Sequence, residues 1–319
     1  SISIILYSSV LAFFFTIVLV PIFIKHSKYF GLIDKPSSRK MHQGHIPTIG
    51  GLSIVLSFVP VYVFYHIAGV GIEYDTKFYS ILIGTVIIFL TGLIDDVRGL
   101  GAFQKFLFQL LAALIVVVGG VTFFSTEIYF FGRYTFKSFE YIFTLIYIVG
   151  ITNAINLIDG LDGLAGGVAF IISGAFLGLG LISGLQLGFV YILAPLMASL
   201  IGFLIYNRQP ARIFLGDAGS LFIGWIFSIT SILFAQKTAF SLSIVIPVIA
   251  LGLPAFDVIF VMVKRFLGKH RYSFKRRWVE MFVADNTHIH HLLIKAGLSK
   301  KKTVWLLYLV TLLTGIMAG

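Results

Sequence analysis

The chain has 319 residues, of which 58% are hydrophobic and only 12% charged, and its formal net charge is +11. A soluble domain carries about 25% charged residues, so the composition excludes one. Because the chain has no cysteine, it also excludes a disulfide framework, a thiolate nucleophile and a cysteine metal site. We therefore expect an all-α polytopic membrane protein, since lipid offers no partner to free backbone groups.

Apolar runs of about 20 residues, each long enough to cross a bilayer, recur along the whole chain. We predict about ten transmembrane helices in one integral-membrane domain, 1–319, at about 3–24, 48–67, 78–94, 103–121, 139–155, 166–182, 188–206, 218–235, 242–263 and 303–319. Between the fourth and fifth spans, residues 121–136 mix threonine with aromatic residues. This stretch favours either a small extracellular β-hairpin or an aromatic loop at the membrane interface.

The basic residues predict the orientation of the helices. With the N-terminus outside, 20 of the 24 Lys and Arg residues lie on the connections that face the cytoplasm, at about 25–47, 95–105, 156–165, 207–217 and 264–302. We therefore expect a multi-pass protein of the inner (cytoplasmic) membrane. The positive face suits anionic membrane lipids and phosphorylated substrates, and it requires no nucleic acid.

Most acidic residues fall on the same predicted face. They lie on cytoplasmic connections or at span ends: Asp34, Asp95, Asp96, Asp159, Asp162, Asp217, Glu280 and Asp285. Asp257 lies inside the ninth span, nearer its cytoplasmic end. Because buried acids in membrane proteins usually mark functional sites, we expect one shared site at the cytoplasmic mouth.

Two acidic motifs suggest chemistry at phosphate groups. Adjacent Asp95 and Asp96 end the third span, and their oxygens suit Mg²⁺ or a general base, although a helix end with a salt bridge to Arg98 explains them too. Asp217 opens the eighth span within a Gly-Asp-x-Gly-Ser motif. It is either a helix cap or a metal ligand, and Phe214 offers a flat face to a base.

Two further motifs are polar. Asn153, Asn156, Asp159 and Asp162 recur every third residue, which keeps them on neighbouring positions of a helix surface before glycines loosen the chain. The last cytoplasmic connection holds His288, His290 and His291. These histidines could bind zinc, contact diphosphate or sugar oxygens, or be solvated, although the His-Glu-x-x-His pattern of a zinc site is missing.

Taken together, these motifs resemble the polyprenyl-phosphate N-acetylhexosamine-1-phosphate transferases, in particular their WecA/TagO-like branch. The matching pieces occur in family order: Arg39-Lys40-x-His42 to Gly51, Leu93-Ile-Asp95-Asp96, Asn153 to Asp162-Gly-Leu, Phe214-x-Gly216-Asp217-x-Gly219-Ser220 and His288-Ile-His290-His291. Asp95-Asp96 is followed by Val-Arg, so the longer acidic motif of some relatives is missing.

The resemblance implies an Mg²⁺-dependent enzyme (with Mn²⁺ an alternative) that acts on a UDP-N-acetylhexosamine and undecaprenyl phosphate, in the first membrane step of a polysaccharide or teichoic acid pathway. It assigns catalysis to Asp95, Asp96, Lys105 and Asp159, and the metal to Asp217 and Asn156. It assigns substrate contacts to Asp162, Asn207, Phe214, His288, His290, His291, Arg277 and Thr48. A homodimer is possible, and the sequence does not decide whether one forms.

Three alternatives compete with this interpretation. A muramoyl-pentapeptide phosphate transferase usually carries a Pro-x-His-His-His-type loop, which differs from His-Ile-His-His here. An ion transporter would place its acids near the midplane, often between inverted repeats, and the sequence has no visible repeat. A CDP-alcohol phosphotransferase would follow its Asp-Gly motif with Ala-Arg and spaced aspartates, which this chain lacks.

Overall fold

The structure is a computed structural model. It describes residues 2–30, 33–34, 46–70, 75–123, 137–182, 188–237, 249, 251–268 and 288–318. The predicted hairpin near 121–136, apart from residues 121–123, and the predicted site residue Arg277 lie outside these ranges.

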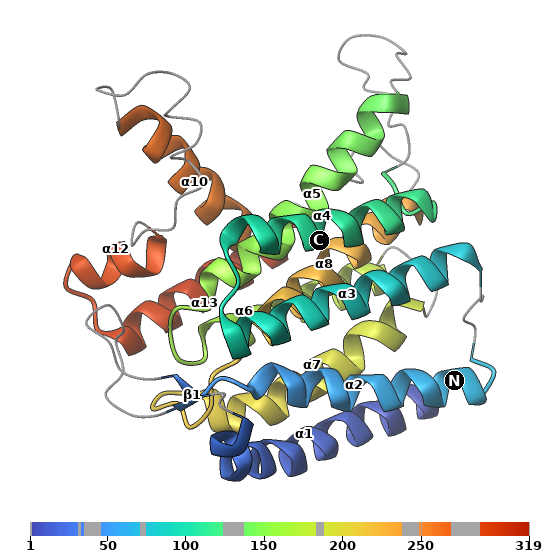
Figure 1. The fold of residues 1–319 in the computed structure, drawn as a ribbon, viewed down its shortest axis with the longest axis horizontal. Coiled ribbons are helices and arrows are strands. Elements are labelled where there is room, and N and C mark those ends of the chain that lie inside the picture. Colours follow the sequence, from blue (N-terminus) through green and yellow to red (C-terminus); the bar gives the residue numbers. More distant parts are fainter. Residues whose placement is uncertain are drawn as a thin grey trace.

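The described chain is almost entirely helical (Figure 1). Its helices are α1 (Ile2–Phe30), α2 (Gly50–Ile67), α3 (Thr76–Arg98), α4 (Ala102–Val118), α5 (Lys137–Ile158), α6 (Leu164–Ile182), α7 (Gly188–Asn207), α8 (Gly216–Lys237), α10 (Gly252–Gly268), α12 (Ile289–Lys295) and α13 (Lys300–Met317). Two short antiparallel strands, β1 (Ile33–Asp34) and β2 (Ile46–Pro47), pair within the first long connection, which the sequence analysis did not predict.

The membrane prediction is confirmed in its main point. In the described ranges, seven helices are long and apolar enough to cross a membrane: most of α1, then α2, α3, α5, α6, α7 and α8. Helix α4 is apolar but shorter. Helices α10 and α13 overlap the last two predicted spans. The chain is therefore a multi-pass membrane protein, while ten crossings and an outside N-terminus stay predictions of hydropathy and charge.

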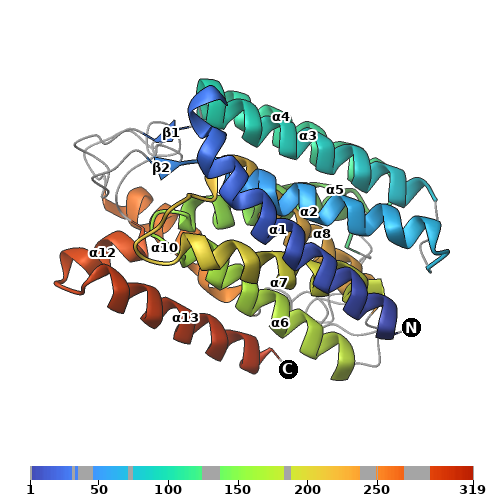
Figure 2. The same cartoon turned by 90° about the horizontal axis from the view of Figure 1, so that it is seen from below.

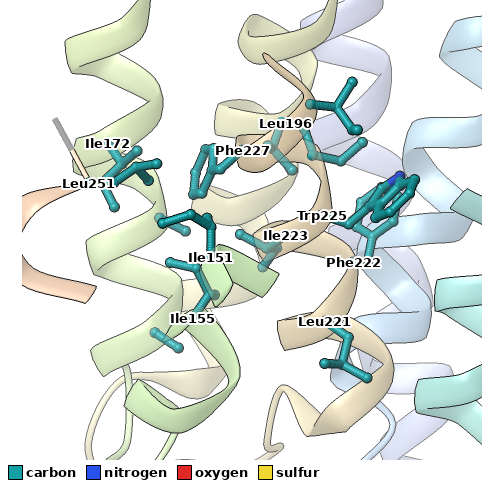
Figure 3. Close-up of a cluster of buried hydrophobic side chains, with 14 of the residues drawn as sticks. Ile151, Ile155, Ile172, Leu196, Leu221, Phe222, Ile223, Trp225, Phe227 and Leu251 are labelled. Atoms are coloured by element: carbon teal, nitrogen blue, oxygen red, sulfur yellow. The ribbon is translucent and has the colours of Figure 1, made fainter. Parts of the chain in front are cut away.

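Helix α8 forms the centre of the bundle and is almost completely buried. Its aromatic side chains leave on opposite sides (Figure 3). The Trp225 indole donates a hydrogen bond to Thr85 Oγ1 of α3 (2.9 Å), while the Phe227 ring lies 6.4 Å from the Phe176 ring of α6. Because one helix packs against several others, its first turn has a defined position relative to all of them.

Small residues bring the neighbouring backbones close to the first turns of α8. A methyl group at Gly51 of α2 would lie 2.2 Å from the Cα of Gly219. A methyl group at Gly92 of α3 would lie 2.5 Å from the Cα of Ala218. Such close approach is typical of membrane helix interfaces, where small residues let backbones touch. It brings α2 and the end of α3 against the residues that flank Asp217.

Candidate active site

The polar motifs meet at one end of the helix bundle. Figure 2 shows β1, β2 and α12 together at that end, while the chain termini lie toward the other. Helices α3, α5 and α7 end there, and α2, α4, α6 and α8 begin there. The prediction that separate connections bring their acids to one face of the protein is therefore confirmed for the described residues.

Lys105 joins two of the predicted acids. Its Nζ lies 2.8 Å from Asp95 Oδ2 and 3.3 Å from Asp217 Oδ2, and all three side chains are partly or mostly buried. The backbone N–H of Leu100 donates to the other oxygen of Asp95, just after the C-cap residue of α3, Gly99. Two carboxylates thus share one ammonium group, which leaves excess negative charge at this point.

Asn156 approaches Asp217 from α5. Its Nδ2 donates to Asp217 Oδ1 and, at 2.8 Å, to Ser220 Oγ one turn further along α8. Ser220 stood in the Gly-Asp-x-Gly-Ser motif, but the sequence analysis gave it no role. One turn deeper, Gln109 of α4 and Asn153 of α5 exchange side-chain hydrogen bonds. This amide pair, of which Gln109 is buried, fixes α4 against α5 and so aligns Lys105 with Asn156.

Asp96 has different partners from its neighbour Asp95. Its two carboxylate oxygens accept the backbone N–H groups of Asp217 (2.8 Å) and Ala218 (2.9 Å). A carboxylate at this position satisfies free N–H groups of the first helical turn and complements the helix dipole. Gly216 opens α8 with a positive φ of 75°, which favours glycine. Asp96 therefore caps α8, while Asp95 pairs with Lys105.

The first connection and the loop before α8 run side by side. Phe214 donates its N–H to the Pro47 carbonyl (2.7 Å) and accepts from the Gly50 N–H (2.9 Å). A methyl group at Gly216 would lie 2.2 Å from the Thr48 carbonyl oxygen. The structure thus brings the predicted substrate residues Thr48 and Phe214 next to Asp217.

The turn between α5 and α6 carries Asp159 and Asp162. Burial raises the pKa of Asp159 to about 8, and the negative charges of Asp217, Asp96 and Asp162 raise it further. Asp162 accepts the Ala211 N–H (3.0 Å), which ties the turn to the loop before α8. Asp159 therefore holds a proton at neutral pH unless a cation joins these acids.

Asn207 forms a second tie between the same two segments. It is only 4% exposed, accepts the Gly163 N–H (3.0 Å) and donates to the Ile213 carbonyl (2.8 Å). From α13, the Tyr308 hydroxyl donates to the Gly163 carbonyl (2.5 Å). The predicted substrate contact of Asn207 stays a prediction, and its side-chain amide bonds to the backbone of both segments. Tyr308 lies in the apolar helix α13, outside every sequence motif, so no local pattern pointed to it.

The three histidines differ in their surroundings. His288 Nδ1 donates to Asp257 Oδ2 of α10 (2.9 Å), and both side chains are buried. His290 is 3% exposed, and its Nε2 has no hydrogen-bond partner among the described residues. Burial lowers the pKa of His290 to about 4, so its ring is neutral at physiological pH. His291 is partly exposed. His288 thus anchors the segment, His290 packs inside the protein, and His291 lies partly at its surface.

The oxygen donors around Asp217 suit Mg²⁺. In the described ranges, no group of three or more His, Cys, Asp or Glu side chains is placed to hold a metal ion, so the zinc alternative gains no support there. Mg²⁺ needs only one or two protein carboxylates, since it keeps waters and substrate phosphates as ligands. The carboxylates of Asp217 and Asp95 converge on one cation, Lys105, and the Asn156 amide lies beside them.

Comparison with known proteins agrees with the family resemblance of the sequence motifs. The model of glycosyl transferase family 4 matches residues 78–235. A probable undecaprenyl-phosphate N-acetylglucosaminyl 1-phosphate transferase of Bacillus subtilis is 40% identical over 312 residues, covering 95% of this chain and 80% of the relative. An undecaprenyl-phosphate alpha-N-acetylglucosaminyl 1-phosphate transferase of Thermotoga maritima is 29% identical over 312 residues (98% and 88%). A decaprenyl-phosphate N-acetylglucosaminephosphotransferase of Mycobacterium tuberculosis is 30% identical over 303 residues (88% and 73%).

Proposed function

Because this chain belongs to glycosyl transferase family 4, we propose that it transfers N-acetylglucosamine 1-phosphate from UDP-N-acetylglucosamine to undecaprenyl phosphate. The products are undecaprenyl-diphospho-N-acetylglucosamine and UMP. The observation that carries the proposal is the convergence of Asp95 and Asp217 on Lys105 at one end of a membrane bundle. A lipid phosphate and a water-soluble nucleotide can meet there, as this reaction requires.

The reaction is a phosphoryl transfer. An oxygen of the lipid phosphate forms a bond to the sugar-linked β-phosphorus, and the bond from that phosphorus to the bridging oxygen breaks. The electron pair leaves with UMP. Because two anions must approach each other, neutralising their charge is the main task of the site. Lys105 is held between two carboxylates, and its ammonium group can turn toward an incoming phosphate.

Asp217 and Asn156 are the residues that would hold Mg²⁺, with Mn²⁺ as an alternative. When bound, the ion supplies positive charge to the diphosphate of the nucleotide. Asp96 keeps the first turn of α8 in place, so Asp217 faces Lys105 and Asn156. Asp95 holds Lys105 on the opposite side. The partners of these residues indicate their roles. Asp95, Lys105 and Asp217 face the reacting groups, while Asp96 orients Asp217 through the backbone of α8.

The nucleotide and sugar contacts come from the segments that surround this centre. Asp159 and Asp162 shape the turn between α5 and α6, and Phe214 offers its ring to uracil. His290 approaches the same turn from α12, and His291 follows it in that helix. The apolar helix faces at this end accept the polyprenyl chain. In this arrangement the protein works at the cytoplasmic side of the membrane, at the start of a cell-surface polysaccharide or teichoic acid pathway.

The test is UMP release by purified protein with undecaprenyl phosphate, Mg²⁺ and a panel of UDP-sugars. UDP-N-acetylglucosamine should support turnover, and Asp217→Asn should abolish it at saturating Mg²⁺. Turnover only with UDP-muramoyl-pentapeptide would favour the related peptidoglycan enzyme instead. A protein that releases no UMP from any sugar nucleotide would overturn the proposal, and near-normal turnover by Asp217→Asn would refute the metal role.

A further inference from the structure

Asp257 lies in α10, outside every motif that suggested chemistry in the sequence. We propose that Asp257 is a positioning residue: through His288 and the first turn of α12, it holds His290 against the turn between α5 and α6, where His290 contacts the sugar nucleotide. This inference rests on the proposed function and adds a residue to its substrate site. It is carried by the hydrogen bonds of Asp257 and by the unpaired nitrogen of His290.

The hydrogen bonds of Asp257 all reach the same short segment. The residue is 2% exposed, and burying a carboxylate is costly unless both oxygens are hydrogen-bonded. Oδ2 accepts from His288 Nδ1 (2.9 Å), and Oδ1 accepts from the backbone N–H of Ile289 (2.8 Å). Two donors that are adjacent in the chain fix both the position of the segment and the ring of His288, whose proton must sit on Nδ1.

Helix α12 has no local cap that could replace these bonds. Its N-cap residue is His288, which makes no side-chain hydrogen bond to the helix. The first backbone N–H groups of any helix need partners from elsewhere. For Ile289 that partner is a carboxylate on α10, 32 residues earlier in the chain. The start of α12 is therefore tied to α10, while the helix itself packs against α13.

His290 follows two residues later and reaches the candidate site. A methyl group at Gly160, next to Asp159, would lie 2.4 Å from His290 Nε2, so this ring packs directly against the turn. Nε2 is buried and has no partner among the described residues. A buried polar atom without a partner costs about 1–3 kcal/mol. A hydroxyl or phosphate oxygen of the sugar nucleotide that enters beside this turn would satisfy it.

The rings of His288 and His290 lie nearly parallel in the same short segment, with interplanar angle 10° and ring centroids 6.1 Å apart. A change in how His288 is held therefore changes where the His290 nitrogen points. Since the ring of His290 is neutral, it acts by directed hydrogen bonding, which depends on orientation more than a charge does.

The experiment compares Asp257→Asn, His290→Ala and the double variant in UMP release, with each substrate varied in turn. Asparagine can still accept the Ile289 N–H but presents an amide donor to His288. We expect kcat/KM for UDP-N-acetylglucosamine to fall about 10- to 100-fold, the loss typical of residues that orient a metal-binding histidine in the same way. The KM for undecaprenyl phosphate should stay unchanged. The double variant should be no worse than His290→Ala alone, because both changes remove the same contact.

Ser299→Ala is the matched control. Ser299 caps α13 by accepting the Lys302 N–H (3.3 Å), so its loss weakens a helix start close to α12 without touching His288 or His290. Its kinetics should match those of the unmodified protein. Effects of Asp257→Asn and His290→Ala that multiply in the double variant would indicate a merely structural aspartate and overturn the inference.

A second pair of variants covers the case in which Asp257→Asn does not fold. His288→Asn keeps a donor near the position of Nδ1 and should retain most activity, while His288→Ala should lose it. Equal activity of the two would overturn the inference. A protein without any UMP release would overturn the proposed function and this inference together. Wild-type kinetics of a folded Asp257→Asn variant would overturn the inference alone.

Discussion

Asp96 accepts a hydrogen bond from the backbone N–H of Asp217 at 2.8 Å, although 121 residues separate the two. One acid of the candidate site thus sets the start of the helix that carries another. The side chain of Asp96 works on the backbone of α8, which leaves the Asp217 side chain free to face Lys105 and Asn156. Adjacent aspartates on α3 consequently have different tasks.

Asp96→Ala should lower both stability and activity. It removes the acceptor of two N–H groups in the first turn of α8, which costs about 1–2 kcal/mol for a helix cap. It also releases the backbone of Asp217, so kcat should fall. Asp96→Asn keeps one acceptor, so its stability and activity should lie between those of Asp96→Ala and the unmodified protein. Asp75→Ala is the control, since Asp75 caps the far end of α3 by accepting the Phe78 N–H (2.9 Å). Thermal unfolding and UMP release measure both effects.

Lys105→Met should reduce kcat by about 100-fold or more, because it removes a positive charge from the place where two phosphates meet. Lys105→Arg should recover part of this loss. The control is Lys301→Met, at an exposed position in the first turn of α13. A Lys105→Met variant with the kcat of the unmodified protein would remove Lys105 from the mechanism.

Asp159 should make stability depend on pH. Its folded pKa of about 8 exceeds the unfolded value of about 3.9, so the folded state holds a proton that the unfolded state loses. Stability therefore falls as pH rises from about 4 to about 8 and then stays level. In a buffer that contains a metal chelator, Asp159→Asn should flatten the dependence of stability on pH. It should raise the unfolding temperature more at pH 8 than at pH 5. An equal gain at both values would contradict the assignment.

Tyr308 should stabilise the turn that carries Asp159 and Asp162. Tyr308→Phe removes the hydrogen bond to the Gly163 carbonyl, with an expected loss of about 1 kcal/mol. Gly167→Ala should be worse, since its methyl group would lie 2.1 Å from the Tyr308 hydroxyl oxygen. Tyr308→Ala in the Gly167→Ala background should recover part of that stability. Unfolding of the unmodified protein, Gly167→Ala, Tyr308→Ala and the double variant in the same detergent measures the coupling, and strictly additive losses would contradict the contact.

The amino-acid sequence by itself determined the class of protein and predicted several polar residues that the structure brings together. Apolar runs long enough to cross a bilayer, and polar motifs beside glycine at their ends, are local features of the sequence. In a bilayer the apolar runs lie in the lipid and the polar motifs lie at its surface. These features were enough to predict that the acids Asp95, Asp159 and Asp217 meet at one end of the bundle. No local signal distinguished Asp95 from Asp96.

The tertiary structure alone decided which partner each polar group has. Asp96 bonds to α8 because glycines let α3 approach that helix closely, and Asp257 bonds to His288 because α10 lies beside the start of α12. Such partners lie many residues apart, and their choice depends on how whole helices pack. A hydrophobic pattern sets which face of a helix is buried, but the close packing of side chains sets its rotation and depth.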